Sequence, residues 1–338
     1  MRNLPELAAC IDRLAGTSGR HPDWLPGLTL SRALRVTEPL SDVTRPVLAL
    51  IAQGAKRTVL ADRVYDYQAG QYLIATVDLP LSAQVTRATP TEPFLGLGLP
   101  LKEHVIADLL LQTGTTAGNG ESIYPAQRVP GLAPGRVAGP TASASAGIGG
   151  SRGVVPPDGV AGIVVSDASD DLVDAVLRLL RLAERPQDFA VLGPAAEREI
   201  HWRLMNGPHA AAVRRIGLAG SRVSLVGRAV RWLAEHYDQP IRIADLADHV
   251  GVSVPTLNRH FRAVTAMSPL QYQKQLRLQR ARVELLAAPG DVAAVGYAVG
   301  YDSPSQFSRE YRRLFGVPPG QDAQRLLATE AGASPVGA

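Results

Sequence analysis

Apolar residues in the last third of the chain follow the 3.6-residue spacing of amphipathic helices, and the same pattern occurs twice. The first copy covers residues 243–264 and is interrupted at Gly251, and the second covers residues 291–315 and is interrupted at Gly300. Glycine adopts the left-handed turn conformation at little cost, so each copy predicts two helices joined by a tight turn. The sequence therefore predicts two helix-turn-helix units in tandem.

Two further features of each copy fit this arrangement. A small residue, Ala247 or Gly296, lies four positions before the turn glycine, where it allows the two helices to approach closely. Ser253 and Ser303 stand at the predicted start of each second helix. A serine at this position can accept a hydrogen bond from a free backbone amide, so both are expected to act as N-caps.

A long helix is predicted between the two copies, over residues 268–286, because a proline stands in its first turn and apolar residues follow at helical spacing. Its length would be roughly 28 Å at the rise of an α-helix. One turn of B-DNA is about 34 Å long. A rod of this length would hold two reading heads near successive major grooves on one face of a duplex.

The N-terminal part of the chain shows a different pattern. A short amphipathic helix near residues 4–14 precedes a series of short β-type segments separated by Gly, Pro and Asp, which is typical of a β sandwich or barrel. The predicted strands are residues 29–36, 47–52, 57–60, 72–79, 83–88 and 94–99.

A returning strand at residues 163–165 is followed by predicted helices at 170–183, 194–205 and 209–218, with Pro186 ending the first. The first helix carries more leucines than one buried stripe needs. This favours a dimer contact, although the same leucines could pack against the β domain.

Residues 113–162 differ in composition from the rest of the chain. About a third of them are Gly or Pro, and Ala, Ser and Thr supply much of the remainder. Such a segment buries too little apolar area to offset its chain entropy, so it is predicted to be a disordered insertion.

Charge and composition narrow the classes of function. Between Ser221 and Ala328 there are 14 Lys and Arg against 9 Asp and Glu, whereas the remainder of the chain has 21 against 22. A basic excess confined to one domain is the footprint of polyanion binding. No apolar run approaches the roughly 18 residues of a membrane span, which indicates a cytoplasmic protein without a membrane partner. Cys10 is the only cysteine and is expected to be inert rather than a redox sensor.

Several stretches of the C-terminal third resemble the signature of the AraC/XylS family of bacterial transcription regulators. They are residues 258–262 (NRHFR), 267–269 (MSP), 277–282 (RLQRAR), 299–301 (VGY), 305–309 (SQFSR) and 315–319 (FGVPP). Ala266 and Gly296 depart from the usual glycine and alanine of the family at these positions. Residues 48–56 and 67–80 look like the N-terminal domain of one branch of the family, which resembles a cupin-type jelly roll.

The resemblance implies a one-component regulator that binds promoter DNA, contacts RNA polymerase and senses a small-molecule effector in its β domain. The residues expected to contact DNA are Pro255, Thr256, Asn258, Arg259, Arg262, Ser303, Pro304, Ser305, Gln306, Ser308, Arg309, Arg312 and Arg313. Family positions for base contacts fall on Pro255, Asn258 and Arg259 in the first unit, and on Pro304, Ser305 and Arg309 in the second. Gln306, Arg312 and Arg313 suit phosphates.

The predicted fold class is α+β with several domains. A β-rich, cupin-like effector domain would cover residues 1–112, the insertion 113–162, a helical connector with a possible dimer contact 163–220, and an all-α double helix-turn-helix domain 221–328. No enzyme activity, metal or cofactor is expected, because only His21 and His104 flank the predicted strands. The alternatives are a cupin-pocket enzyme with an added DNA-binding domain and a DNA-binding protein without a ligand.

Overall fold

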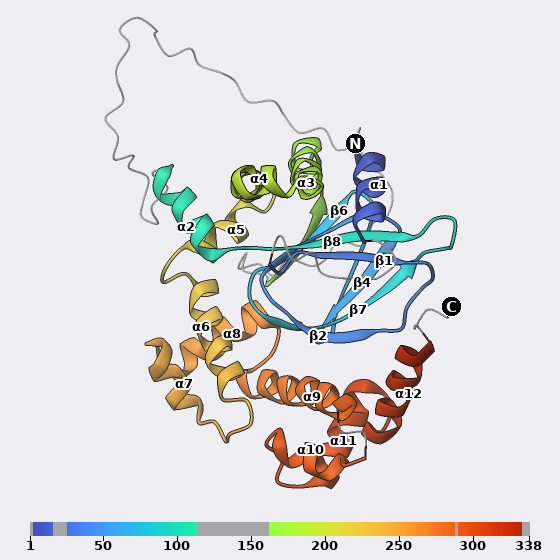
Figure 1. Cartoon of the computed structure of the whole chain (residues 1–338). Helices are drawn as coiled ribbons and strands as arrows, with labels where there is room; N and C mark the ends of the chain where they lie inside the picture. The colour runs from blue at the N-terminus through green and yellow to red at the C-terminus, as the bar shows by residue number, and fades with distance from the viewer. Residues whose placement is uncertain (1–2, 16–25, 114–161, 288–289, 333–338) are drawn as a thin grey trace, which may run out of the picture.

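The computed structural model describes residues 3–15, 26–113, 162–287 and 290–332. Its N-terminal half is built on two antiparallel β-sheets, and its C-terminal half is entirely helical (Figure 1). The predicted α+β class, with a β sandwich followed by a helical helix-turn-helix domain, is confirmed.

One sheet has five strands and the other has four, and the apolar side chains of both are buried between them and beneath the covering helices. The five-stranded sheet has the order β1 (Thr29–Ala33), β8 (Phe94–Pro100), β3 (Val47–Gln53), β6 (Gln71–Ala75) and β9 (Ile163–Asp167). The four-stranded sheet has the order β2 (Leu40–Thr44), β7 (Leu79–Arg87), β4 (Ala55–Leu60) and β5 (Arg63–Gln68).

The structure corrects the strand prediction in two ways. Residues 72–79 do not form one strand: β6 ends at Ala75 in one sheet, and β7 begins at Leu79 in the other. The strands β2 and β5 were not predicted. Both lie at the edges of the four-stranded sheet and carry several exposed or half-exposed polar side chains, so their apolar pattern is weak.

Helices cover the five-stranded sheet at one end (Figure 1). They are α1 (Leu4–Ala15), α2 (Glu103–Gln112), α3 (Asp170–Ala183), α4 (Pro186–Met205) and α5 (Ala210–Gly217). The helix α2 was not predicted. Pro186 follows α3 and is also the first residue of α4. The predicted start of this helix at residue 194 is wrong, because Pro194 lies inside α4.

The leucines of α3 are buried within the chain. Leu172, Leu177, Leu179 and Leu180 are each at most 3% exposed, and α3 packs against α1 and α4. The surplus of leucines in this helix therefore does not supply a surface for a second subunit. Cys10 of α1 is also buried, and burial raises the pKa of its thiol, which makes it a poor nucleophile.

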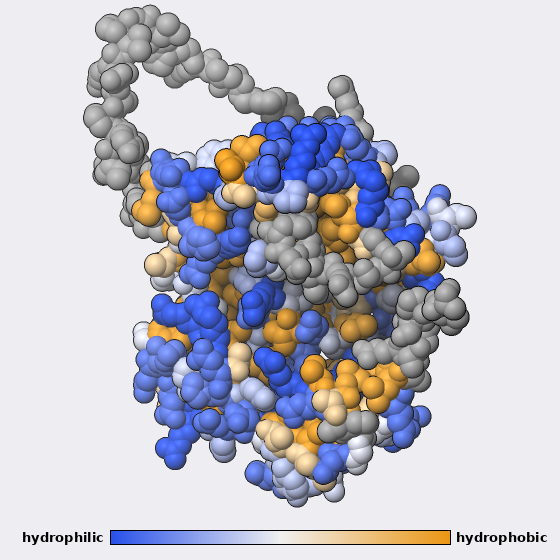
Figure 2. Space-filling view, in the orientation of Figure 1, coloured by the Kyte–Doolittle hydropathy of each residue, from blue (hydrophilic) through white to orange (hydrophobic). Residues whose placement is uncertain are grey.

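The C-terminal half, taken here as residues 222–332, consists of seven helices among the described residues. Figure 2 shows mainly hydrophilic side chains over α6 and α7. The helices are α6 (Arg222–Glu235), α7 (Ile243–Val250), α8 (Val254–Thr265), α9 (Pro269–Ala287), α10 (Val292–Ala298), α11 (Pro304–Phe315) and α12 (Pro319–Gly332). The last of these, α12, was not predicted.

The long helix α9 touches both halves of the molecule. The Tyr272 hydroxyl donates to the backbone oxygen of Asp78 at 2.8 Å, and the Gln279 amide donates to the backbone oxygen of Asp42 at 3.4 Å. Arg325 of α12 adds an ion pair with Glu38 at 2.9 Å. These contacts hold the helical C-terminal half against the outer face of the four-stranded sheet.

Some sequence expectations concern residues outside the described ranges. The predicted insertion falls almost entirely on residues 114–161, which the structure does not describe. His21 lies in another range that is not described, residues 16–25. Within the described residues, no three His, Cys, Asp or Glu side chains come together as a metal-binding group. None of the described helices is both long and apolar enough to cross a membrane.

A buried charged cluster holds α12 onto the second helix-turn-helix unit. The Asp322 carboxylate is fully buried and accepts hydrogen bonds from Arg282 Nε at 2.8 Å and from the Tyr311 hydroxyl at 2.9 Å. Arg282 also lies 4.7 Å from the centre of the Phe315 ring. Each charged group is therefore compensated within the core.

We predict that Asp322→Asn destabilises the full chain by roughly 3–5 kcal/mol, because Arg282 then remains buried without its counter-charge. Urea unfolding followed by circular dichroism measures this loss. The matched control is Asp66→Asn, which removes the carboxylate of an exposed ion pair with Arg57 and should change the unfolding midpoint little. Equal losses for the two variants would contradict the prediction.

Candidate nucleic-acid interface

The first helix-turn-helix unit folds as the sequence predicts. Gly251 ends α7 with a φ of 75°, in the left-handed region, and its amide closes the last turn of the helix. Ala247 is 1% exposed, in agreement with its predicted place between the two helices. Leu257 and Phe261 of α8 are fully buried, so one face of α8 is fixed towards the core and the opposite face is directed outward.

The second unit repeats this geometry with one closer contact. Gly300 has a φ of 87°, and Gly296 lies against the ring of Phe307. A Cβ atom added at Gly296 would meet Phe307 Cδ1 at 3.0 Å, which is tighter than most real contacts. The glycine at this position therefore allows Phe307 of α11 to pack directly onto α10.

The two serines at the helix starts behave differently. Ser303 Oγ accepts a hydrogen bond from the Gln306 amide at 3.4 Å, as predicted for an N-cap. Ser253 does not cap α8: its Oγ donates to the Thr256 hydroxyl at 3.0 Å. The two serines face different side chains three residues on: Thr256 offers a hydroxyl that engages Ser253, whereas the Gln306 side chain is bonded to Glu310.

The structure places the residues predicted to contact DNA on the outer faces of α8 and α11. The exposed ones are Pro255, Arg259, Arg262, Ser305, Gln306, Arg309, Arg312 and Arg313. The half-buried ones are Thr256, Asn258, Ser303, Pro304 and Ser308. Leu314, an apolar residue of α11, is 37% exposed and lies towards the β sandwich rather than in the core of the second unit.

Five arginines on these two helices are free of protein partners. Within the described residues, none of them makes an ion pair or a hydrogen bond with another side chain or with the backbone through its guanidinium. They are Arg259, Arg262, Arg309, Arg312 and Arg313. Burial, Arg222 and Arg259 together lower the pKa of His260, so the positive charges around this imidazole disfavour its protonation.

Helix α9 supplies positioning residues that the sequence did not reveal. Arg277 donates from Nε to the Tyr237 oxygen at 2.6 Å, from Nη2 to the Gln239 oxygen at 2.9 Å, and from Nη1 to the Gly300 oxygen at 2.6 Å. Gln273 donates to the same Tyr237 and Gln239 oxygens. One guanidinium thus ties the segment that precedes the first unit to the turn of the second.

A second set of contacts fixes α11. Glu310 accepts from Lys274 of α9 at 2.8 Å, from the Tyr301 hydroxyl at 3.0 Å and from Gln306 at 3.2 Å. Burial alone would raise the pKa of Glu310, but these hydrogen bonds outweigh it and lower the pKa. Glu310, the only acid on α11, is therefore ionised and paired with Lys274 rather than with one of the exposed arginines.

Comparison with known proteins covers both halves of the chain. The family model described as "AraC-type transcriptional regulator N-terminus" matches residues 24–212, and a "Helix-turn-helix domain" model matches residues 246–325. Among curated relatives, the chain is 30% identical over 144 residues to the HTH-type transcriptional regulator ArgR of Pseudomonas aeruginosa, and 32% identical over 173 residues to CdhR of the same organism.

These matches cover 43% and 49% of this chain, and 44% and 48% of the two relatives, which is less than half of the relatives' own length. The fold is similar to a crystal structure of ToxT from Vibrio cholerae O395 bound to (E)-4-(8-methylnaphthalen-1-yl)but-3-enoic acid. The TM-score is 0.50 at 8% identity, over 88% of this chain and 97% of ToxT. At this identity the similarity describes the fold.

The end of α8 carries a strained backbone. Ala266 has a φ of 61°, in the left-handed region that costs an alanine free energy and a glycine almost none. We predict that Ala266→Gly stabilises the chain by roughly 0.5–1 kcal/mol. Thermal unfolding is the measurement, and Ala263→Gly inside α8 is the control, expected to destabilise by about 1 kcal/mol. A loss of stability in Ala266→Gly would contradict the prediction.

Proposed function

Because the chain belongs to the AraC family of transcription regulators, we propose that it binds promoter DNA sequence-specifically and that a small molecule in its N-terminal domain controls this binding. Family membership rests on the N-terminal family model, which covers residues 24–212 of 338. The observation that supports DNA binding most directly is that five arginines on the exposed faces of α8 and α11 have no partner among the described residues.

The two recognition helices would divide the work of reading. In the first unit, Asn258 suits the edge of adenine and Arg259 suits guanine. In the second, Arg309 is placed equivalently on the exposed face of α11. Arg312 and Arg313 lie in the last turn of α11 and suit phosphates. Contacts with RNA polymerase and with a second subunit belong to the same proposal, by resemblance to the family.

We predict that Arg259→Ala and Arg309→Ala each weaken specific binding by roughly 1–3 kcal/mol and relax base preference only in one half of the site. Arg313→Ala should instead lower affinity for all sequences about equally and reduce the salt slope by about one. Selection of binding sites from random duplexes, followed by fluorescence anisotropy at several salt concentrations, separates the two effects.

The control for this experiment is Arg185→Ala, which removes one exposed positive charge between α3 and α4, far from either recognition helix in the chain. It should leave both affinity and the selected motif unchanged. If Arg259→Ala and Arg309→Ala both select the wild-type motif in both halves, base reading by the two helices is refuted.

The proposed effector site is a cavity of about 320 Å³ between the two sheets. Its wall combines apolar side chains, such as Leu73 and Phe94, with Lys56, Thr58 and Tyr67. Burial raises the pKa of Tyr67 to about 12, so this phenol stays protonated and can donate a hydrogen bond. The cavity is of the size that holds a small ligand.

Lys56 indicates the charge of the effector. Its ammonium has no ion pair or hydrogen bond with any described residue, and burial lowers its pKa. Arg32, the other cation of the wall, is already paired with Asp12 at 2.6 Å. Asp42, the acid of the wall, is exposed and accepts the Val43 amide. An effector with a carboxylate or another anionic group would therefore supply the negative counter-charge that is missing beside the Lys56 ammonium.

We predict that Lys56→Met stabilises the ligand-free chain by roughly 1 kcal/mol at pH 7, because it removes a half-buried charge that has no counter-charge among the described residues. Burial lowers the folded-state pKa of Lys56 below its unfolded value of about 10.4. The destabilisation is complete at pH values below the folded-state pKa and disappears above the unfolded one. Urea unfolding of both chains from pH 7 to about pH 10.5 tests this, and a gain that did not shrink as the pH rises would contradict it.

A further inference from the structure

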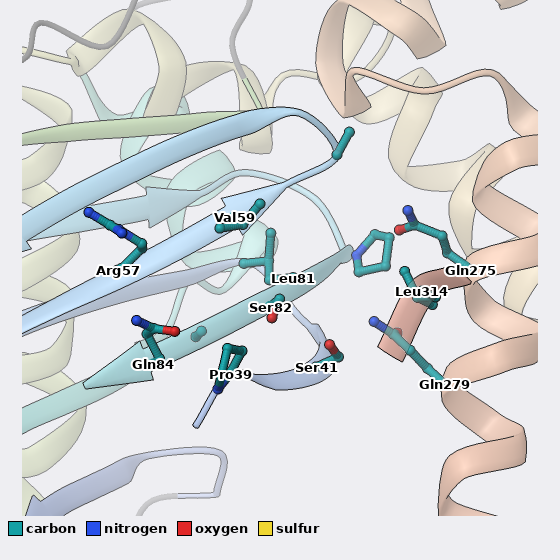
Figure 3. A pocket seen from close by; sticks show the side chains of 13 residues that line it. Pro39, Ser41, Arg57, Val59, Leu81, Ser82, Gln84, Gln275, Gln279 and Leu314 are labelled. Carbon is teal, nitrogen blue, oxygen red and sulfur yellow. The ribbon is translucent and has the colours of Figure 1, made fainter. Parts of the chain in front are cut away.

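A second cavity, of about 280 Å³, lies at the junction between the sandwich and the DNA-binding half (Figure 3). Strands β2, β4 and β7 form one wall. Gln275 and Gln279 of α9 point towards these strands from the other side, and Leu314 of α11 completes the wall. The cavity therefore exists only while both halves of the chain are in contact.

This cavity is separate from the one between the sheets. Successive side chains of a strand point to opposite faces. Arg57 and Val59 of β4 accordingly line the junction cavity, whereas Lys56 and Thr58 line the sandwich cavity. The four-stranded sheet thus has a cavity on each of its faces.

The polar groups of the junction cavity are uncharged, with one exception. Three side-chain amides (Gln84, Gln275, Gln279) and two hydroxyls (Ser41, Ser82) line it. The exception, Arg57, is already bound to both carboxylate oxygens of Asp66, at 2.7 and 3.0 Å. A charged ligand would lose hydration here without gaining an unpaired opposite charge, so the cavity favours a neutral one.

Gln279 carries an unused acceptor at this site. The residue is 7% exposed, and its Oε1 is buried without a hydrogen-bond partner among the described residues. The orientation of the amide is fixed, because Nε2 faces the Asp42 oxygen at 3.4 Å and a flipped amide would set two oxygens against each other. Buried acceptors are normally satisfied, so this one points to a donor that is not part of the chain.

We propose that the junction cavity binds a small neutral molecule that carries an amide or hydroxyl donor and an apolar ring or chain. The donor would bond to Gln279 Oε1, and the apolar part would lie on Pro39, Pro80 and Leu314. A volume of about 280 Å³ is near the lower limit for ligand pockets, which restricts the ligand to a compact molecule.

Such a ligand joins α9 to the sheet. Because α9 also carries the contacts that orient both helix-turn-helix units, occupancy of the cavity holds the DNA-binding half in its present position on the sandwich. This consequence for regulation rests on the DNA-binding function proposed above, whereas ligand binding itself does not.

The test uses three probes of the same shape and different charge on the isotopically labelled full chain: benzamide, benzoate and benzamidine. Benzamide should shift the side-chain amide resonances of Gln275 and Gln279 in a saturable manner below about 10 mM. Benzamidine should shift neither, and benzoate should act instead on residues around Lys56. No saturable shift with benzamide, or equal shifts of Gln279 with all three probes, would overturn the proposal.

Variants on both walls locate the site. Gln279→Met keeps the side-chain length but removes the acceptor, and should weaken benzamide binding roughly tenfold. Ser82→Leu fills the cavity from the strand side and should abolish binding. The matched control is Gln324→Met, the same substitution at an exposed position of α12, which should leave the affinity unchanged. Unaltered benzamide affinity in both Gln279→Met and Ser82→Leu would refute the assignment.

Gel shifts with the same proteins keep the two proposals distinct. Benzamide binding at Gln279 without any DNA binding by the wild-type chain would refute the function proposed above and leave the cavity assignment standing. Sequence-specific DNA binding without a benzamide site would refute the cavity assignment and leave the proposed function standing.

Discussion

The guanidinium of Arg277 determines how the two helix-turn-helix units are placed relative to one another. Its three hydrogen bonds join Tyr237 and Gln239, which precede the first unit, to Gly300 in the turn of the second. Burial lowers the pKa of Arg277, but an arginine starts so high that it stays charged, and charge-assisted bonds to carbonyls are stronger than neutral ones. Gly300 contributes by having no Cβ, which would collide with the Asp238 oxygen.

Helix α9 can hold this position because it is buried on more than one side. Tyr272 and Leu276 belong to the large core that includes the sandwich and the first unit, whereas Leu278, Ala281 and Leu285 belong to the smaller core of the second unit. A helix with apolar contacts in several directions cannot rotate to expose one of them without loss. The rod that carries the reading heads is therefore also the element that attaches them to the sandwich.

The sequence predicts the parts of this architecture whose cause is local. Gly251 and Gly300, the apolar faces of α8 and α11 and the outward arginines all follow from spacing within a few residues. The edge strands β2 and β5 escape prediction because much of their length faces solvent. Arg277 escapes it for another reason: its partners are backbone oxygens up to 40 residues away, and any residue type can supply those.

The capping serines show the same limit at closer range. Ser253 and Ser303 look alike in the sequence, yet only Ser303 accepts a backbone amide, because the Ser253 hydroxyl bonds to the Thr256 hydroxyl instead. The four-stranded sheet extends the argument to regulation. Leu81, Ala83 and Gln84 line both cavities, so the same short stretch of β7 separates the proposed effector from the junction with α9. Since packed interiors transmit displacement rather than absorb it, any ligand that shifts β7 on one face changes the surface on which α9 rests.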